Sequence, residues 1–250
     1  MSLSTIACAI NKYMAAILIG YVVLVSSAQA GTKLTLNSGT AEPFITEDGG
    51  GFYGEVVKEI FSRLDIDAKV IRLPSSRSIL NANQGIDAGV IARTKGFEKK
   101  YANLIRVPSA IVKFKFVAYS LDETIKVTDW DSFAPYSVGI IRGWRIYEKN
   151  IRNAKQITKV NNADQLFKLL LNGRSDLVLF EYYRGSWWNK HLNAKAYLIG
   201  SPIAEKEMFI YMHKKHAALV PEITRVIEQM KQDGTYEKIK DKTLMVDMKQ

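Results

Sequence analysis

Short strands and amphipathic helices alternate in this 250-residue chain, and this alternation constrains the fold more than any other feature. The alternating run Lys33–Ser38 predicts a strand, and Gly54–Leu64 places its apolar side chains on one helical face. A strand over Ala68–Leu73, a helix over Ser75–Asn83 and a turn into a short strand over Gly85–Val90 follow. This order of strand, helix, strand, helix and strand is typical of a parallel α/β sheet.

The alternation begins again in the second half of the chain. Phe114–Ser120 has a strong strand pattern, and the expected elements after it are strands over Tyr136–Ile141, Asp176–Phe180 and Glu207–His213, with helices over Ala163–Leu171 and Pro221–Lys231 and a short tail helix. No Pro-rich or Ser-rich linker separates the two halves. We therefore expect two α/β units joined by two short crossovers.

The composition is that of a folded soluble protein, with 47% apolar and 24% charged residues. It excludes bulk disorder, collagen-like repeats and a polytopic membrane protein. The formal charge is +10, but lysine and arginine are spread along the chain and interleaved with acids. Because nucleic-acid sites need clustered basic residues, no nucleic-acid partner is expected.

The N-terminus has the pattern of an export signal. Lys12 precedes the apolar run Tyr13–Val25, and Ala28-Gln29-Ala30 forms an A-x-A cleavage signal. Residues 1–30 are therefore predicted to be a cleavable signal peptide; an uncleaved anchor helix is the alternative. The mature chain would begin at Gly31, reach a bacterial periplasm and lack cysteine, because Cys8 is the only one in the chain.

Several short motifs occur in the order known from one family. They are Pro43-Phe44 after the first strand, Gly54 opening a helix, Gly85-x-Asp87-Ala88, Val138-Gly139-Ile140-Ile141-Arg142-Gly143, Leu171-Asn172-Gly173-Arg174-Ser175-Asp176 and Asp233-Gly234-Thr235-Tyr236. From about Lys33 to Leu244, the chain resembles the periplasmic solute-binding proteins of the polar amino acid type, family 3, as a divergent member.

The resemblance implies a bilobed α/β clamshell of the type II periplasmic-binding-protein class, with two mixed sheets flanked by helices and a two-strand hinge. Lobe 1 would comprise residues 31–111 and 212–250, and lobe 2 residues 112–211. The implied function is capture of a small anionic or zwitterionic solute between the lobes, with a polar amino acid as first choice. The implied partner is an inner-membrane transporter or a sensor protein, and a monomer without a cofactor is expected.

An arginine is the expected anion grip, since its planar fork binds a carboxylate through two hydrogen bonds. Arg93 follows the strand that starts near Ala88, at the carboxyl end where α/β sheets bind ligands. The family usually carries Thr-x-x-Arg at this point, whereas here Arg93 precedes Thr94 and Lys99 lies nearer the usual position of the arginine. Arg93 and Thr94 are thus candidate ligand-binding residues, Lys99 is the alternative cation, and Arg77 is a second arginine near the cleft.

On the second lobe, the resemblance assigns the ligand's ammonium to an acid near Glu181, which ends a strand. Ser38, after the first strand, is a candidate hydrogen-bond donor. Other candidates are the loop aromatics Phe44 and Tyr53, with Phe52, as a lid or stacking wall; Gly143, with free N–H groups for an anion; and Trp144, for stacking on an apolar part of the ligand. For each of these the alternative is ordinary packing, a plain turn or a solvated charge.

No catalytic or metal motif is visible. His213-x-x-His216 lacks the glutamate of a metalloprotease motif, and neither a nucleophile elbow nor a phosphate-binding loop occurs. The leading expectation is therefore a binding protein, not an enzyme. Two alternatives stay open: an enzyme on the same scaffold, such as a cyclohexadienyl dehydratase, and a sensory ligand-binding module.

Overall fold

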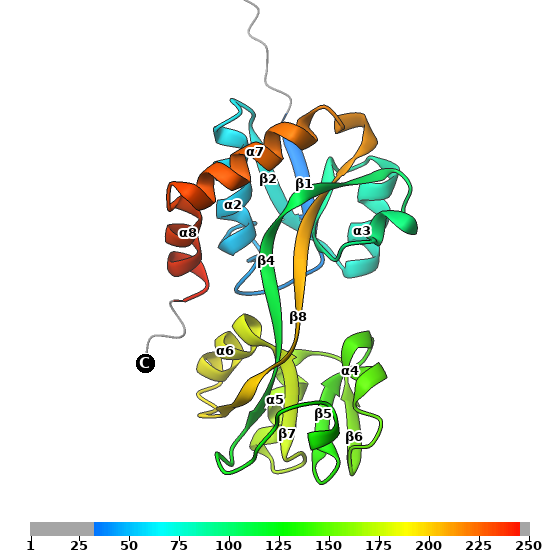
Figure 1. The fold of residues 1–250 in the computed structure, drawn as a ribbon, viewed down its shortest axis with the longest axis vertical. Helices are drawn as coiled ribbons and strands as arrows, with labels where there is room; N and C mark the ends of the chain where they lie inside the picture. Colours follow the sequence, from blue (N-terminus) through cyan, green and yellow to red (C-terminus); the bar gives the residue numbers. More distant parts are fainter. Residues whose placement is uncertain (1–32, 246–250) are drawn as a thin grey trace, which may run out of the picture. The chain divides into compact units, whose positions relative to one another are not determined.

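The computed structural model describes residues 33–245. The predicted signal peptide lies outside the described residues. One mixed sheet of eight strands, in the order β2-β1-β3-β8-β4-β7-β5-β6, forms the centre of this part of the chain (Figure 1). None of the helices in this part is long and apolar enough to cross a membrane.

The strands are β1 (Leu34–Ser38), β2 (Ala68–Arg72), β3 (Gly89–Arg93), β4 (Leu104–Ser120), β5 (Ser137–Ile141), β6 (Gln156–Val160), β7 (Leu177–Glu181) and β8 (Tyr197–His213). The helices are α2 (Gly51–Ser62), α3 (Ser75–Gln84), α4 (Arg145–Asn150), α5 (Ala163–Leu171), α6 (Tyr182–His191), α7 (Leu219–Gln232) and α8 (Thr235–Thr243). Three short 3-10 helices, η1 (Phe97–Lys99), η2 (Asp131–Phe133) and η3 (Lys214–His216), complete the described part.

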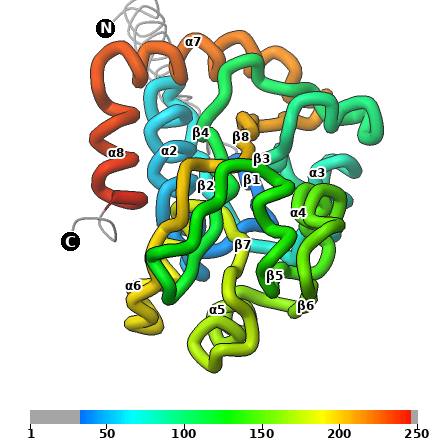
Figure 2. The backbone as a smooth tube through the Cα atoms, turned by 60° about the horizontal axis from the view of Figure 1, so that its bottom comes forward, coloured from blue at the N-terminus to red at the C-terminus, as the bar shows by residue number. Residues whose placement is uncertain are grey.

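Lobe 1 is built on β2, β1 and β3, which pair in parallel as the alternation of strands and helices predicted. Helices α2, α7 and α8 pack together on one flank, and α3 packs against β1 and β3 (Figures 1 and 2). The apolar stripe of α2 is fully buried, so hydrophobic burial holds this helix on the sheet. Lobe 2 repeats the pattern with β6, β5 and β7 in parallel, with α5 packed on β5 and β7.

Strands β4 and β8 are each 17 residues long and pass through both lobes as an antiparallel pair. The sequence predicted only Phe114–Ser120 and Glu207–His213 as strands, because exposed polar residues interrupt the apolar pattern elsewhere. The expected pair of separate sheets is also wrong in detail. Because β4 and β8 pair along most of their length, the strands of the two lobes belong to one sheet.

The sequence missed β6 and α6. The weakest sequence signal belongs to α6, which contains Gly185 and has no clear apolar stripe. Gly185 lies against the ring of Tyr119: a Cβ at this position would meet Tyr119 Cε2 at 2.3 Å. The glycine thus permits close packing of α6 on β4, although it lowers the intrinsic helix propensity.

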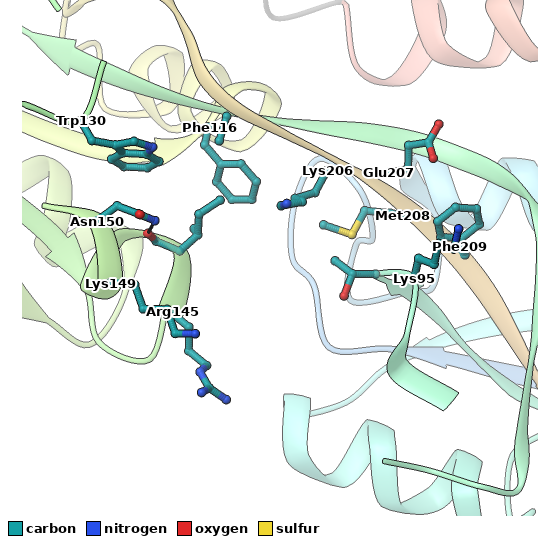
Figure 3. A pocket seen from close by; sticks show the side chains of 13 residues that line it. Lys95, Phe116, Trp130, Arg145, Lys149, Asn150, Lys206, Glu207, Met208 and Phe209 are labelled. Carbon is teal, nitrogen blue, oxygen red and sulfur yellow. Dashed lines mark hydrogen bonds between the residues drawn. The ribbon is translucent and has the colours of Figure 1, made fainter. Parts of the chain in front are cut away.

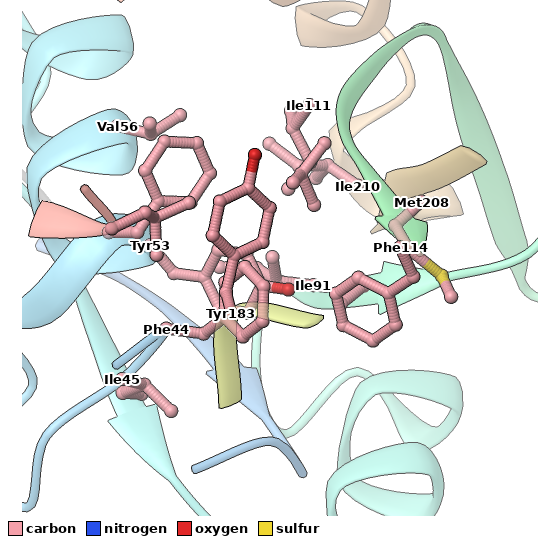
Figure 4. Close-up of a cluster of buried hydrophobic side chains, with 14 of the residues drawn as sticks. Phe44, Ile45, Tyr53, Val56, Ile91, Ile111, Phe114, Tyr183, Met208 and Ile210 are labelled. Atoms are coloured by element: carbon pink, nitrogen blue, oxygen red, sulfur yellow. The ribbon is translucent and has the colours of Figure 1, made fainter. Parts of the chain in front are cut away.

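A buried cluster connects the two lobes on the side of α2 and α6. Tyr183, from α6, inserts between lobe 1 side chains that include Phe44 and Ile111 (Figure 4). Its ring lies 5.9 Å from that of Phe44 in an edge-on arrangement. Phe44 itself is fully buried and stacks on Tyr53 at 5.1 Å. The sequence predicted that Phe44 lies in a lid or stacking wall near the cleft mouth, whereas the structure buries this ring in the core.

Candidate functional site

Two lobe 1 residues and two lobe 2 residues carry polar groups that are coupled electrostatically through the Tyr53 hydroxyl. Tyr53 comes from α2 and Arg93 from the end of β3, whereas Glu181 ends β7 and Arg184 lies in the first turn of α6. Burial and the nearby Glu181 carboxylate raise the pKa of Tyr53 well above its usual value, whereas the Thr40 hydroxyl and the guanidinium groups of Arg93 and Arg184 act in the opposite direction. We call these four residues the interlobe cluster.

The interlobe cluster is short of hydrogen-bond partners. Within residues 33–245, partners are missing for six buried polar side-chain atoms, and four of these are Tyr53 Oη, Arg93 Nε, Glu181 Oε1 and Arg184 Nε. Buried polar groups are normally hydrogen-bonded, because an unpaired group forfeits its interactions with water. Four of the six unpaired atoms therefore belong to the interlobe cluster, which makes its residues our candidates for binding a polar solute.

A chain of hydrogen bonds holds Arg93. Its Nη2 donates to Ser78 Oγ at 3.3 Å, and that hydroxyl donates to Asn37 Oδ1 at 2.5 Å. Asn37 Nδ2 in turn donates to Asp87 Oδ2 at 2.6 Å. Since Ser78, Asn37 and Asp87 are buried, the chain fixes the direction of the arginine while its Nε stays unpaired. Burial lowers the pKa of Arg93.

We expect Ser78→Ala to weaken both the fold and the anion grip. The change leaves the buried Asn37 Oδ1 without its donor, which costs about 1–3 kcal/mol. The midpoint of urea unfolding should fall accordingly, and affinity for an anionic ligand should fall because Arg93 loses a support. Ser76→Ala, at an exposed position of the same helix, is the matched control. An unchanged midpoint for Ser78→Ala would contradict the role of this chain.

Glu181 is fully buried and also caps α6, since its Oε2 accepts the backbone N–H of Arg184 at 3.0 Å. Burial raises the pKa of Glu181 to about 7, although this hydrogen bond and the Arg184 guanidinium act against the rise. The prediction that Glu181 lies at the end of a strand is confirmed. Its second oxygen, Oε1, has no partner among the described residues and can accept a hydrogen bond from a solute.

Arg184 was not predicted from the sequence. Its guanidinium carbon lies 4.7 Å from the ring centroid of Phe180 and 5.6 Å from that of Trp144. Its side chain donates no hydrogen bond to any residue of the described part. The available signal was its spacing from Glu181, because residues three apart at a helix start share one face. That signal required α6 to be recognised as a helix.

The turn after β5 differs from the expectation. Gly143 has φ +83, which explains the glycine, but its N–H donates to Glu148 Oε1 at 3.2 Å. The N–H groups of Trp144 and Arg145 donate to Ile141 and Gly143 carbonyls. The prediction of free N–H groups for an anion at Gly143 is therefore wrong. Trp144 stacks on Tyr147 at 5.8 Å and supports Arg184, so the protein itself supplies its stacking partners.

The remaining candidates differ in burial and in hydrogen bonding. Ser38 is buried at the end of β1, where its Oγ donates to Thr40 Oγ1 at 3.0 Å. Arg77 is exposed on α3, and no hydrogen bond or ion pair joins it to the rest of the described chain. Lys99 is exposed on η1, which leaves Arg93 as the better-placed cation. Tyr53 lies on a helix and in the core, not on a lid, but its hydroxyl belongs to the cluster.

A cavity of about 770 Å³ opens between α4 and β8 (Figure 3). Arg145 and Lys149 approach it from lobe 2, and Lys95, Met208 and Phe209 lie on the opposite side. The candidate residue Thr94, which follows Arg93 in the sequence, also lines this cavity. Its basic lining favours the entry of anionic solutes.

The comparison with protein families identifies the class. A family described as bacterial extracellular solute-binding proteins, family 3, matches residues 36–245. The chain therefore belongs to this family. An uncharacterized protein of Shewanella oneidensis is 25% identical over an alignment of 180 residues, and the match covers 67% of this chain. The matched segment spans 66% of that relative, slightly less than two-thirds of its length.

Solved structures share the fold at low sequence identity. An ancestral arginine-binding protein bound to glutamine superposes with a TM-score of 0.66 at 22% identity, covering 84% of this chain and 97% of that one. A histidine kinase sensor domain similar to periplasmic binding proteins gives 0.70 at 13% identity, over 86% and 96%. An ancestral amino acid-binding protein, described as a precursor of cyclohexadienyl dehydratase, gives 0.66 at 15%, over 85% and 95%. The predicted bilobed type II fold is confirmed.

Proposed function

We propose that this protein captures a small anionic or zwitterionic solute, with a polar amino acid as first choice, and delivers it to a membrane transporter. The observation that supports the proposal is that Arg93 and Glu181 each have an unpaired buried polar atom and both act electrostatically on the Tyr53 hydroxyl. The arginine would grip a carboxylate and the glutamate an ammonium. Family membership and the predicted signal peptide over residues 1–30 support action outside the cytoplasm.

Binding and lobe closure are coupled in this proposal. We take lobe 1 as residues 31–111 plus 212–250 and lobe 2 as residues 112–211, so that Arg93 and Glu181 lie on different lobes. A solute that touches both residues binds the closed arrangement more tightly than the open one. It therefore shifts the population toward the closed state by that difference in affinity.

The proposal is tested by thermal unfolding of residues 31–250 with polar amino acids, dicarboxylates and sugar acids. A ligand present at 100 times its Kd stabilises the folded state by about 2.7 kcal/mol. For a chain of this size, we expect a rise in Tm of roughly 5 °C or more. A panel in which no compound raises Tm would contradict the proposal.

We predict that ligand binding depends on pH because of the Glu181 carboxyl group. Because the pKa of Glu181 is about 7, its carboxyl group is protonated at lower pH and must lose that proton before it can pair with the ligand's ammonium. Affinity for an amino acid should therefore fall below pH 7, by up to about tenfold per pH unit, with proton release at pH 6. Calorimetry at pH 6 and pH 8 in buffers of different ionisation enthalpy measures both effects, and Glu181→Gln should abolish them. A flat pH profile in the wild type would contradict the assignment.

One observation favours a second candidate, an enzyme on the same scaffold. A buried carboxyl with a pKa of about 7 is suited to general acid or base chemistry near neutral pH. One of the structurally similar proteins is itself described as a precursor of a dehydratase. Incubation with cyclic carboxylic acids, followed by chromatography, distinguishes the two: a binding protein returns the solute unchanged, whereas a dehydratase converts it and Glu181→Gln stops the conversion.

A further inference from the structure

Arg184 places a second cation in the interlobe cluster. No ion pair joins Arg93 or Arg184 to any carboxylate of residues 33–245. By contrast, Arg72, which lines a neighbouring cavity with Arg184, is paired with Glu42 at 2.9 Å. A partly buried guanidinium with no carboxylate partner is costly unless an anion compensates it. With two arginines and one glutamate, the interlobe cluster thus carries one positive charge more than its ionised carboxylate can neutralise.

The surroundings of Arg184 fix its guanidinium without occupying its donors. Stacking on Phe180 and Trp144 uses the flat faces of the group, and these contacts leave the N–H groups at its edge free. The backbone N–H of Arg184 is held by Glu181 Oε2 at 3.0 Å, which sets the start of α6. A preformed fork of this kind is suited to a carboxylate.

The space beside Arg184 is large enough for the outer part of a small solute. A cavity of about 530 Å³ is lined by Arg184 together with Gly39, Thr40, Ala41, Glu47, Arg72, Leu73 and Pro74. The Thr40 hydroxyl accepts a hydrogen bond from Ser38 Oγ at the buried end of β1, and Glu47 is exposed to solvent. Arg184 therefore borders both the interlobe cluster and an open space that chain atoms do not fill.

The charges of the cluster define the ligand that complements it. Arg93 and Arg184 are positive, and Glu181 in its ionised form is negative. We propose that Arg184 is a specificity-determining residue and that the ligand is an acidic amino acid, with one carboxylate on Arg93, the ammonium on Glu181 and the second carboxylate on Arg184. This inference rests on the proposed function, and it adds the class of amino acid.

Calorimetric titration of the 31–250 protein with matched pairs tests the inference: glutamate against glutamine, and aspartate against asparagine. Each pair differs in the charge of one side-chain group and little in shape. We expect the wild type to prefer the acid at least tenfold. Arg184→Gln should lower the affinity for the acid at least tenfold and leave that for the amide within about threefold. Arg174→Gln, at an exposed arginine of the same lobe, should change neither affinity.

The outcomes separate this inference from the proposed function. Amide binding that equals or exceeds acid binding, or an acid preference that persists in Arg184→Gln, would overturn the role of Arg184 and leave the proposed function intact. Binding of no amino acid by the wild type would overturn both. If Arg184→Gln fails to fold, Arg184→Lys is used instead: it keeps the charge and loses the fork, so the acid preference should shrink without disappearing.

Discussion

Replacement of Arg93 by alanine is expected to lower ligand affinity by at least about thirtyfold. Removing one partner of a buried, hydrogen-bonded charge pair costs about 2–5 kcal/mol, because the ligand's carboxylate is left without its counter-ion. Arg93 is the arginine that the Asp87, Asn37 and Ser78 chain holds in place, so water cannot easily substitute for it. Calorimetry with the strongest ligand from the thermal panel measures the loss.

The matched control for this prediction is Arg77→Ala. Arg77 is exposed on α3 and forms no hydrogen bond or ion pair with the interlobe cluster, so its loss should leave Kd within about twofold. Both variants should retain the Tm of the unliganded wild type within a few degrees. Equal losses of affinity in the two variants would mean that the general positive charge of the protein, not Arg93, attracts the ligand.

Replacement of Phe44 by alanine is expected to produce the largest loss of stability, about 3–5 kcal/mol. Its ring is fully buried among Phe52, Tyr53, Phe114 and Tyr183, with centroid distances between 4.9 and 6.2 Å. The loss combines the transfer free energy of the ring with the cavity that remains. Urea unfolding, analysed as a two-state transition, gives the difference in free energy.

Leu80→Ala is the control for Phe44, since Leu80 is 53% exposed and should lose little stability. The affinity of Phe44→Ala, measured below its unfolding midpoint, separates two roles for this ring. A core residue changes stability first, with a modest effect on Kd through Tyr53. A normal unfolding midpoint combined with lost affinity would instead support the lid or stacking wall that the sequence predicted for Phe44.

The sequence predicted residues whose place follows from the order of strands and helices. Arg93 and Glu181 end strands, and strand ends in an α/β sheet converge on the ligand site, so their position could be inferred without coordinates. The parallel order within each lobe followed from the alternation of elements for the same reason. The joining of two expected sheets into one could not be inferred, because pairing of β4 with β8 depends on residues about 100 positions apart.

Residues whose role depends on a spatial partner were not predictable. The N–H of Gly143 donates a hydrogen bond to Glu148, and the ring of Phe44 packs against Tyr183 from the other lobe. Arg184 needed a helix that Gly185 and a run of aromatic residues concealed. Ser78 looked like an ordinary polar helix residue, because its contacts with Asn37 and Arg93 join three separate elements.

The most direct test is a crystal structure of the protein with the strongest ligand from the panel. We predict that a ligand carboxylate lies within hydrogen-bond distance of Arg93 and that its ammonium lies against Glu181 Oε1, with both lobes in contact with the solute. A ligand bound elsewhere, for example only against Arg145 and Lys149 in the cavity beside α4, with Arg93 and Glu181 untouched, would contradict the account.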